Sequence, residues 1–234
     1  MKEIGGYIEL DTYTGAMLHE KAIALNCGRG ALEYLCEAKM IRKLYLPYFL
    51  CDSIPNLCKK IDVEYEFYHI NRAFEPIFTK EINANEWLYI VNFYGQLSNE
   101  YLQTWKQRYD RVIVDNAQSY FQMPVDGLDT LYTCRKYFGV ADGAFLYSDM
   151  RLSKEIPQDE SFERMHFLLG RYERSANEFY SEYAANNKLF ATEPVKRMSR
   201  LTENLLHGID YEAVAKRRQE NFDFLDAEFG DIMS

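Results

Sequence analysis

Polar side chains that can do chemistry follow several segments typical of buried strands. Asp115 ends the apolar run VIVD, and Asn92 follows the run WLYIV. Thr133 and Lys136 lie in the segment TCRK, just after another strand-like run. Open α/β sheets bind ligands beyond the carboxyl ends of their strands. Because a buried carboxylate is destabilising unless something pairs with it, the pattern predicts a site in which Asp115 faces a bound group.

The start of one predicted helix favours an anion. Gly28, Arg29 and Gly30 open this helix, and Thr133 supplies a hydroxyl after a strand. Glycines at a helix start leave backbone N–H groups accessible at the positive end of the helix dipole, which suits phosphate. We call these four residues the phosphate cradle.

Together these groups fit pyridoxal phosphate. This cofactor requires a carboxylate facing its ring nitrogen, a lysine amine that forms a Schiff base and an anion cradle for its phosphate. Asp115 is the candidate for the ring nitrogen and Lys136 for the Schiff-base lysine. Each also has a structural interpretation, since Asp115 could cap a turn and Lys136 could be a surface lysine. The glycines could simply start a helix, and Asn92 could satisfy backbone groups at its strand end.

The elements that position these residues alternate between strand and helix. Helices are predicted over 27–40, 53–61 and 98–109, the first with Leu32, Leu35, Cys36 and Met40 on one face. Strands are predicted over 43–47, 63–68, 87–93, 111–115, 130–134 and 143–149. Strands separated by helices predict an α/β fold with a mostly parallel sheet flanked by helices.

The pattern becomes purely helical from about residue 159. Apolar residues keep helical spacing from Phe162 to Phe179, which predicts a helix of several turns. A further helix ends at Gly208, and a last one places Tyr211, Val214, Arg218, Phe222, Leu225 and Phe229 on one face. We therefore expect an α/β domain over 1–158 and a helical segment over 159–234, whose last apolar face requires a partner.

Composition excludes several functional classes. The 234 residues carry a formal net charge of −9, which argues against a nucleic-acid surface. The start lacks the apolar stretch of a signal peptide, and no apolar run is long enough to span a membrane. The five cysteines form no CxxC pair and indicate reduced thiols in a cytoplasmic protein, and no histidine stands at metal-ligand spacing.

The order of these motifs resembles the DegT/DnrJ/EryC1/StrS family, the fold-type-I sugar aminotransferases. The likeness lies in YIVNFYGQ, in the D-x-A-Q element Asp115–Gln118, and in TCRK followed by Gly143-Ala144. CGRGALEYL is similar to the helix start with which the family binds phosphate, and LPYFLCDSI to its strand-then-proline segment. The match covers most of residues 26–150, and residues 195–230 resemble the family more loosely.

The resemblance implies a role for each matching residue. Asp115 would pair with the pyridoxal phosphate ring nitrogen, Gln118 would lie near the ring hydroxyl, and Lys136 would form the Schiff base and move protons. The residue that stacks on the ring would be Cys51, where the family often has an aromatic, and Phe49 lies nearby. Asn92, at the same strand edge, is a further candidate for cofactor contact.

The function implied is transfer of an amino group from an amino acid such as glutamate to a keto nucleotide-sugar. The family's sites lie at a dimer interface, which implies a homodimer, and its products enter cell-surface polysaccharide. The family also carries a smaller second domain after the helical region, so we expect this chain to lack it. Two alternatives stay open: a sugar dehydratase or lyase, disfavoured by Lys136, and a truncated pyridoxal-phosphate-binding or cofactor-free protein with a structural or regulatory role.

Overall fold

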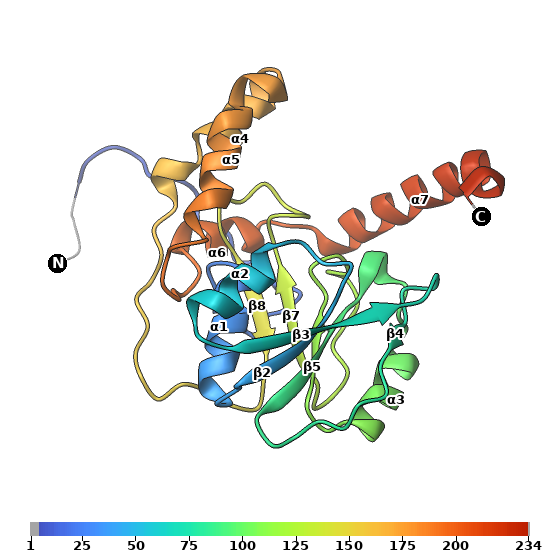
Figure 1. Cartoon of the computed structure of the whole chain (residues 1–234). Coiled ribbons are helices and arrows are strands. Elements are labelled where there is room, and N and C mark those ends of the chain that lie inside the picture. The colour runs from blue at the N-terminus through green and yellow to red at the C-terminus, as the bar shows by residue number, and fades with distance from the viewer. Residues whose placement is uncertain (1–4, 234) are drawn as a thin grey trace.

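The described strands form one mixed, 8-stranded sheet whose centre is parallel (Figure 1). The computed structural model describes residues 5–233, with side chains described for residues 5–230. The strands are β1 (Ile23–Leu25), β2 (Lys43–Pro47), β3 (Glu64–Ile70), β4 (Pro76–Ile77), β5 (Glu86–Val91), β6 (Val112–Asp115), β7 (Asp129–Thr133) and β8 (Ala144–Tyr147). Their order is β1-β8-β7-β6-β5-β2-β3-β4. Strands β7, β6, β5, β2 and β3 run parallel, whereas β8 is antiparallel to both of its neighbours and β4 is antiparallel to β3. The predicted mostly parallel sheet is confirmed.

Helices cover both faces of this sheet. Along β5, Trp87, Tyr89 and Val91 pack into the core on the side of α1 (Gly28–Ala38) and α2 (Ser53–Lys60). The alternate residues of β5 pack on the opposite side with α3 (Asn99–Arg108). Successive side chains of a strand point to opposite faces, so one fully apolar strand supplies two separate cores.

Local sequence explains where two of the predicted helices begin and end. Ser98 caps α3 by accepting a hydrogen bond from the Tyr101 amide at 3.2 Å, as expected for a serine at the N-cap. In α1, Leu32, Leu35 and Cys36 are buried as predicted. Met40 was predicted on the same face, but it follows the end of α1 in a left-handed conformation (φ 53°) and is 70% exposed. The helix α1 thus ends at Ala38, before the last residue of the predicted apolar face.

The long helix predicted from Phe162 to Phe179 is wrong. The chain instead forms a 3₁₀ turn, η2 (Phe162–Arg164), then α4 (His166–Glu173), a second 3₁₀ turn, η3 (Ala176–Phe179), and α5 (Tyr180–Leu189). Arg174 is extended, so the chain reverses there, and α4 and α5 form a hairpin that projects from the body (Figure 1). Phe179 packs so closely on Gly170 that a Cβ there would lie 2.3 Å from its ring. The glycine therefore permits the hairpin.

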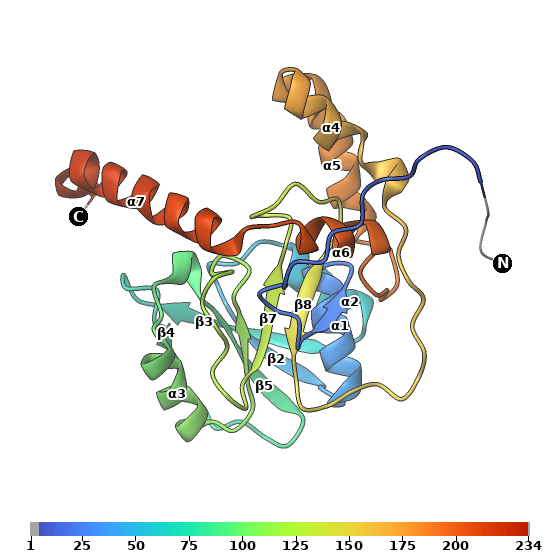
Figure 2. The same cartoon turned by 180° about the vertical axis from the view of Figure 1, so that it is seen from behind.

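The remaining helices are α6 (Arg200–His207) and α7 (Tyr211–Met233). α6 lies against the sheet, whereas α7 extends away from the body (Figure 2). Phe222, Leu225 and Phe229 are about half exposed, in agreement with the prediction for that part of the apolar face. Tyr211 and Val214, from the same predicted face, instead pack on a core cluster of this chain. Regular elements after residue 159 are helices, but Arg197 bridges to Leu25 of β1. The predicted boundary at 158/159 stays a prediction.

The N-terminal segment from residue 5 to residue 18 has no regular structure and runs beside α6 (Figure 2). The Tyr13 amide donates to Asn204 Oδ1 at 2.9 Å, and His207 Nδ1 lies 2.6 Å from the Gly15 carbonyl oxygen. Within the described part of the chain, every helix is too short or too polar to cross a membrane.

Candidate active site

One edge of the sheet gathers most of the predicted site residues. Val91 pairs with Asp115 and Asp115 with Leu131, so parallel β5, β6 and β7 end at the same edge. β1 and β7 are both antiparallel to β8 and therefore run in the same direction. The chain thus enters α1 at this edge too. The topology places Asp115, Thr133 and Gly28 together, as the sequence predicted.

Asp115 is a buried carboxylate with two hydrogen-bond donors inside the fold. Its Oδ2 accepts from the Tyr89 hydroxyl at 2.6 Å, and its Oδ1 accepts from the Ala117 amide at 2.8 Å. Burial raises the pKa of Asp115, while both donors and the positive charge of Lys136 oppose that rise. A carboxylate can accept further hydrogen bonds at each oxygen. Asp115 therefore keeps acceptor capacity for a cationic group, whose charge would lower its pKa.

Lys136 lies in the loop between β7 and β8, and its side chain is exposed. The loop is fixed at its base, where the Cys134 amide donates to the Gly143 carbonyl oxygen at 3.0 Å. Gly143 has a φ of 116°, and a Cβ there would lie 3.1 Å from atoms of both Cys134 and Thr202. The described residues form no hydrogen bond or ion pair with the Lys136 ammonium, yet its charge acts on Asp115. The positive charge of Lys136 therefore favours the ionised form of Asp115.

The candidate residues of the phosphate cradle lie at the start of α1 and the end of β7. Gly28 lies against Thr133, because a Cβ on Gly28 would approach Thr133 Cγ2 to 3.1 Å. A Cβ on Gly30 would lie 2.8 Å from Asn26 Oδ1. Cys27 is the N-cap, and its Sγ accepts from the Gly30 amide at 3.2 Å. The first amides of a helix have no carbonyl partner within the helix, so the Gly28 and Arg29 amides point out of the helix start.

Asn92 lies inside the fold rather than at its surface. Its amide nitrogen donates to Gln122 Oε1 at 2.7 Å and to Asn116 Oδ1 at 3.1 Å, while its oxygen accepts from the Leu97 amide at 2.9 Å. These bonds hold the turn that carries Tyr94 (φ 55°). The arrangement favours the structural interpretation of Asn92, and its contact with a cofactor stays a prediction.

The predicted cofactor contacts Gln118 and Cys51 lie in the loops that follow β6 and β2. Gln118 is half-buried three residues after Asp115. Cys51 is exposed just after β2, with its Sγ 2.9 Å from Ser53 Oγ. Phe49, the nearby aromatic, is 55% exposed, with its ring centre 5.2 Å from that of Phe93. Their predicted roles toward the cofactor stay predictions.

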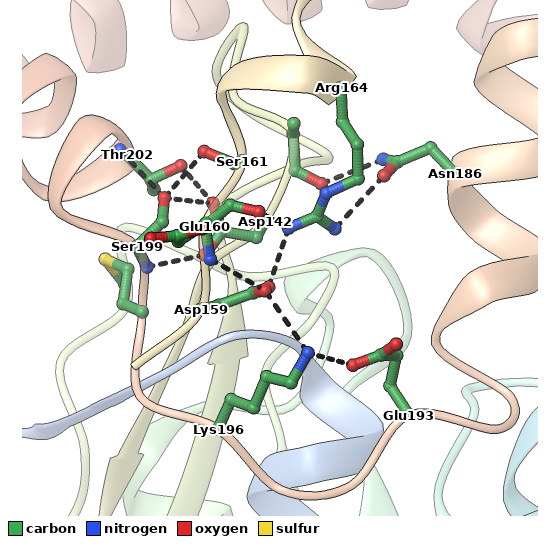
Figure 3. Close-up of polar contacts among 12 residues, drawn as sticks. Asp142, Asp159, Glu160, Ser161, Arg164, Asn186, Glu193, Lys196, Ser199 and Thr202 are labelled. Atoms are coloured by element: carbon green, nitrogen blue, oxygen red, sulfur yellow. Dashed lines mark hydrogen bonds and ion pairs between the residues drawn. The ribbon is translucent and has the colours of Figure 1, made fainter. Parts of the chain in front are cut away.

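Sequence reasoning missed residues that fix the Lys136 loop (Figure 3). Buried Asp142 accepts from the Ser199 amide at 2.8 Å, from Ser199 Oγ at 2.7 Å and from Thr202 Oγ1. Asn186 of α5 donates to the Ala141 carbonyl oxygen at 2.8 Å. The loop is thereby tied to α5 and α6. The one related signal in the sequence is the segment RMSRLT, whose short polar residues are typical of a helix N-cap but do not indicate a contact with Asp142.

A second ionic group in the same view holds the segment that leads into the hairpin (Figure 3). Asp159 lies between two cations, with its Oδ2 2.7 Å from Arg164 Nη2 and its Oδ1 3.6 Å from Lys196 Nζ. Glu193 also pairs with Lys196. No group of three or more metal-binding side chains occurs in the described residues 5–230.

No family model matches the sequence, and no curated protein matches it. Solved structures are similar to it. A DegT DnrJ EryC1 StrS aminotransferase from Brucella abortus is 15% identical over 55% of this chain and 41% of its own, with a TM-score of 0.44. An aminotransferase from Psychrobacter cryohalolentis is 18% identical over 55% and 37%, with a TM-score of 0.45. NtdA from Bacillus subtilis, solved with bound PMP, is 16% identical over 62% and 39%, with a TM-score of 0.45. This chain thus spans about two fifths of these structures, which include aminotransferases of the family that its sequence resembles.

Proposed function

We propose that this chain is the cofactor-binding part of a pyridoxal-phosphate-dependent aminotransferase. The amino donor is an amino acid such as glutamate, and the acceptor is the keto group of a nucleotide sugar. One observation carries the proposal: a buried strand-end acid, a lysine without a partner among the described residues, and a glycine-rich helix start lie at one sheet edge.

The residues present fit the cofactor. The cradle is tight at Gly28 and Gly30, where a side chain would meet Thr133 or Asn26. The Gly30 amide donates to Cys27 Sγ, so the Gly28 and Arg29 amides at the helix start are the ones left to bind a phosphate. Asp115 lies in a buried position where a cationic ring nitrogen would offset its desolvation. Lys136 is exposed and so can react with an aldehyde. We assign phosphate binding to Gly28, Arg29, Gly30 and Thr133.

Each residue then has a defined chemical task. When bound, pyridoxal phosphate supplies an electron sink for carbon–hydrogen bond cleavage. Asp115 holds the proton on the ring nitrogen by charge, with Tyr89 and the Ala117 amide fixing its two oxygens. Lys136 Nζ, as the free base, accepts a proton and later returns it. Gln118 is proposed to contact the ring hydroxyl, and Cys51 and Asn92 to line the remaining cofactor surface.

The wider setting belongs to the same proposal. We place the protein in the cytoplasm, as a homodimer, in nucleotide-sugar biosynthesis for cell-surface polysaccharide. The sugar would then be bound by loops at the sheet edge and by the second subunit.

A visible absorption spectrum with added pyridoxal phosphate tests the proposal. We expect a new band in the parent chain, no such band in Lys136→Ala, and an unchanged band in Lys21→Ala, which alters another exposed lysine. A band that persists in Lys136→Ala would refute the lysine assignment. No band in any of the three would favour a cofactor-free structural or regulatory role instead.

A further inference from the structure

Arg29 of the phosphate cradle and the neighbouring Arg135 have no carboxylate partner among the described residues. Arg29 Nη2 donates to the Asn187 carbonyl oxygen at 2.7 Å, and Arg135 Nη1 donates to Asn187 Oδ1. By contrast, the half-buried Lys39, Lys43 and Lys196 each pair with at least one carboxylate. The chain has 36 acidic and 27 basic residues, so carboxylates are abundant. Partly buried Arg111 also lacks a carboxylate and donates to the Ile82 carbonyl oxygen, but Arg29 and Arg135 are two neighbouring cations that share one neutral asparagine.

The arginines lie between the start of α1 and the α4–α5 hairpin. Arg29 is in the first turn of α1, and Arg135 directly precedes Lys136. The Arg135 guanidinium carbon lies 4.5 Å from the centre of the Phe190 ring, just after α5. Its Nε is buried and has no hydrogen-bond partner among the described residues. The Arg135 guanidinium is thus partly buried and keeps an unused donor.

This arrangement is electrostatically unfavourable by itself. Burial lowers the pKa of Arg135, and the like charge of Arg29 lowers it further. Desolvated cations require a counter-charge, and a neutral amide oxygen provides only part of it. Guanidinium groups bind phosphate oxygens with paired, charge-assisted hydrogen bonds that are about twice as strong as neutral ones. An external oxyanion is the partner that satisfies both arginines.

We infer that Arg29 and Arg135 together bind a phosphate or diphosphate group, and that Asn187 releases both guanidinium groups to that anion. Asn187 belongs to α5, so the hairpin shifts when the phosphate oxygens replace its two oxygens. The inference deepens the proposed function, because the site adjoins the cradle, but phosphate binding here does not require the cofactor. The phosphate can belong to the cofactor or to a nucleotide-sugar substrate.

Isothermal titration with inorganic phosphate is the direct test, using the whole chain. Arg135→Gln should weaken binding about tenfold, whereas Arg171→Gln, on exposed α4, should leave it unchanged. Asn187→Ala removes the competing oxygen at Arg135 and should tighten binding several-fold. Asn177→Ala, at an exposed hairpin position, is the matched control. A gain of affinity cannot come from misfolding, so Asn187→Ala decides the matter if Arg135→Gln does not fold.

Two further titrations identify the source of the phosphate. If the cofactor supplies it, Arg135→Gln weakens binding of pyridoxal phosphate but not of pyridoxal. If the substrate supplies it, Arg135→Gln weakens binding of uridine diphosphate to the chain loaded with pyridoxal phosphate. If the affinity for phosphate is unchanged in both Arg135→Gln and Asn187→Ala, the inference is overturned. Phosphate binding that depends on Arg135 without a Lys136-dependent absorption band would refute the proposed function alone.

Discussion

Tyr89 donates its phenol proton to Asp115 across two neighbouring central strands, over 2.6 Å. The register pairs Val91 with Asp115, and Tyr89, two residues earlier on β5, shares the face of Val91. The phenol is fully buried. The orientation of the acid is thereby fixed before any ligand binds, which is what a charge partner for a cofactor requires.

Replacing Tyr89 by phenylalanine should lower the free energy of unfolding by about 1.5–3 kcal/mol, because the hydrogen bond is to a charged group. The phenol lowers the pKa of Asp115, so its removal raises that pKa further. Without the phenol, burying ionised Asp115 is less favourable. The decrease in the free energy of unfolding should therefore be largest above the folded-state pKa of Asp115 and should become smaller as pH falls. Urea denaturation across pH measures this.

Tyr68→Phe is the matched control for that experiment. Tyr68 is buried and donates to the neutral Tyr89 carbonyl oxygen at 2.8 Å. We expect a loss of about 1 kcal/mol without the pH dependence. The same pH dependence in both variants would contradict the assignment to Asp115.

Lys136→Ala should change the free energy of unfolding by less than about 0.5 kcal/mol, because the side chain is exposed and no described residue pairs with it. Lys39→Ala should lower the free energy of unfolding by about 3 kcal/mol. The substitution removes the ammonium that lies 2.7 Å from buried Asp129 in the parent chain, so the carboxylate is left without its cation. Thermal unfolding of both variants checks the contrast. A large loss in Lys136→Ala would mean that this lysine is structural.

Stability should rise with pH as His19 is deprotonated. The side chain is fully buried, with Nε2 2.8 Å from the Tyr120 carbonyl oxygen and Nδ1 3.1 Å from the Tyr147 hydroxyl. Burial lowers the pKa of His19 from 6.5 to about 4. As pH falls, the unfolded chain therefore binds the proton before the folded chain does. His19 contributes roughly 3 kcal/mol to the free energy of unfolding above pH 6.5, and this contribution is lost as pH falls toward 4.

Denaturation of the parent chain and of His19→Gln across that pH window measures the effect. His19→Gln should be less stable at neutral pH and should lose less on acidification. His166→Gln is the control, because His166 is exposed on α4. An equal pH slope in the parent and His19→Gln would rule out this histidine as the cause.

Asp142→Ala should destabilise the chain by about 3 kcal/mol or more, because three donors from Ser199 and Thr202 lose their acceptor. We expect α6 to loosen first, with faster proteolysis near residue 199 and weaker cofactor binding through the Lys136 loop. Asp126→Ala, at an exposed position, should have neither effect. Unchanged proteolysis in Asp142→Ala would show that other contacts hold α6.

The sequence by itself determined where several of the elements begin and end and which residues close the strands at one sheet edge. β2 begins and ends at the predicted residues, Lys43–Pro47, because its apolar run ends at a proline. Ser98 marks the start of α3, and Asp115 closes β6. These features depend on neighbours within a few residues, so local spacing is sufficient to predict them.

Only the tertiary structure decided which side chains meet. Tyr89 reaches Asp115, 26 residues later in the chain, because β5 and β6 pair in one register. Asn187 meets Arg29 and Arg135 because the helix breaks at Arg174, although the apolar spacing continues to Phe179, and the chain turns back on itself. Helical spacing is the same in one long helix and in two packed helices, and Phe179 packing on Gly170 settles the choice. Contacts between distant segments depend on register and packing, which no local pattern in this sequence encodes.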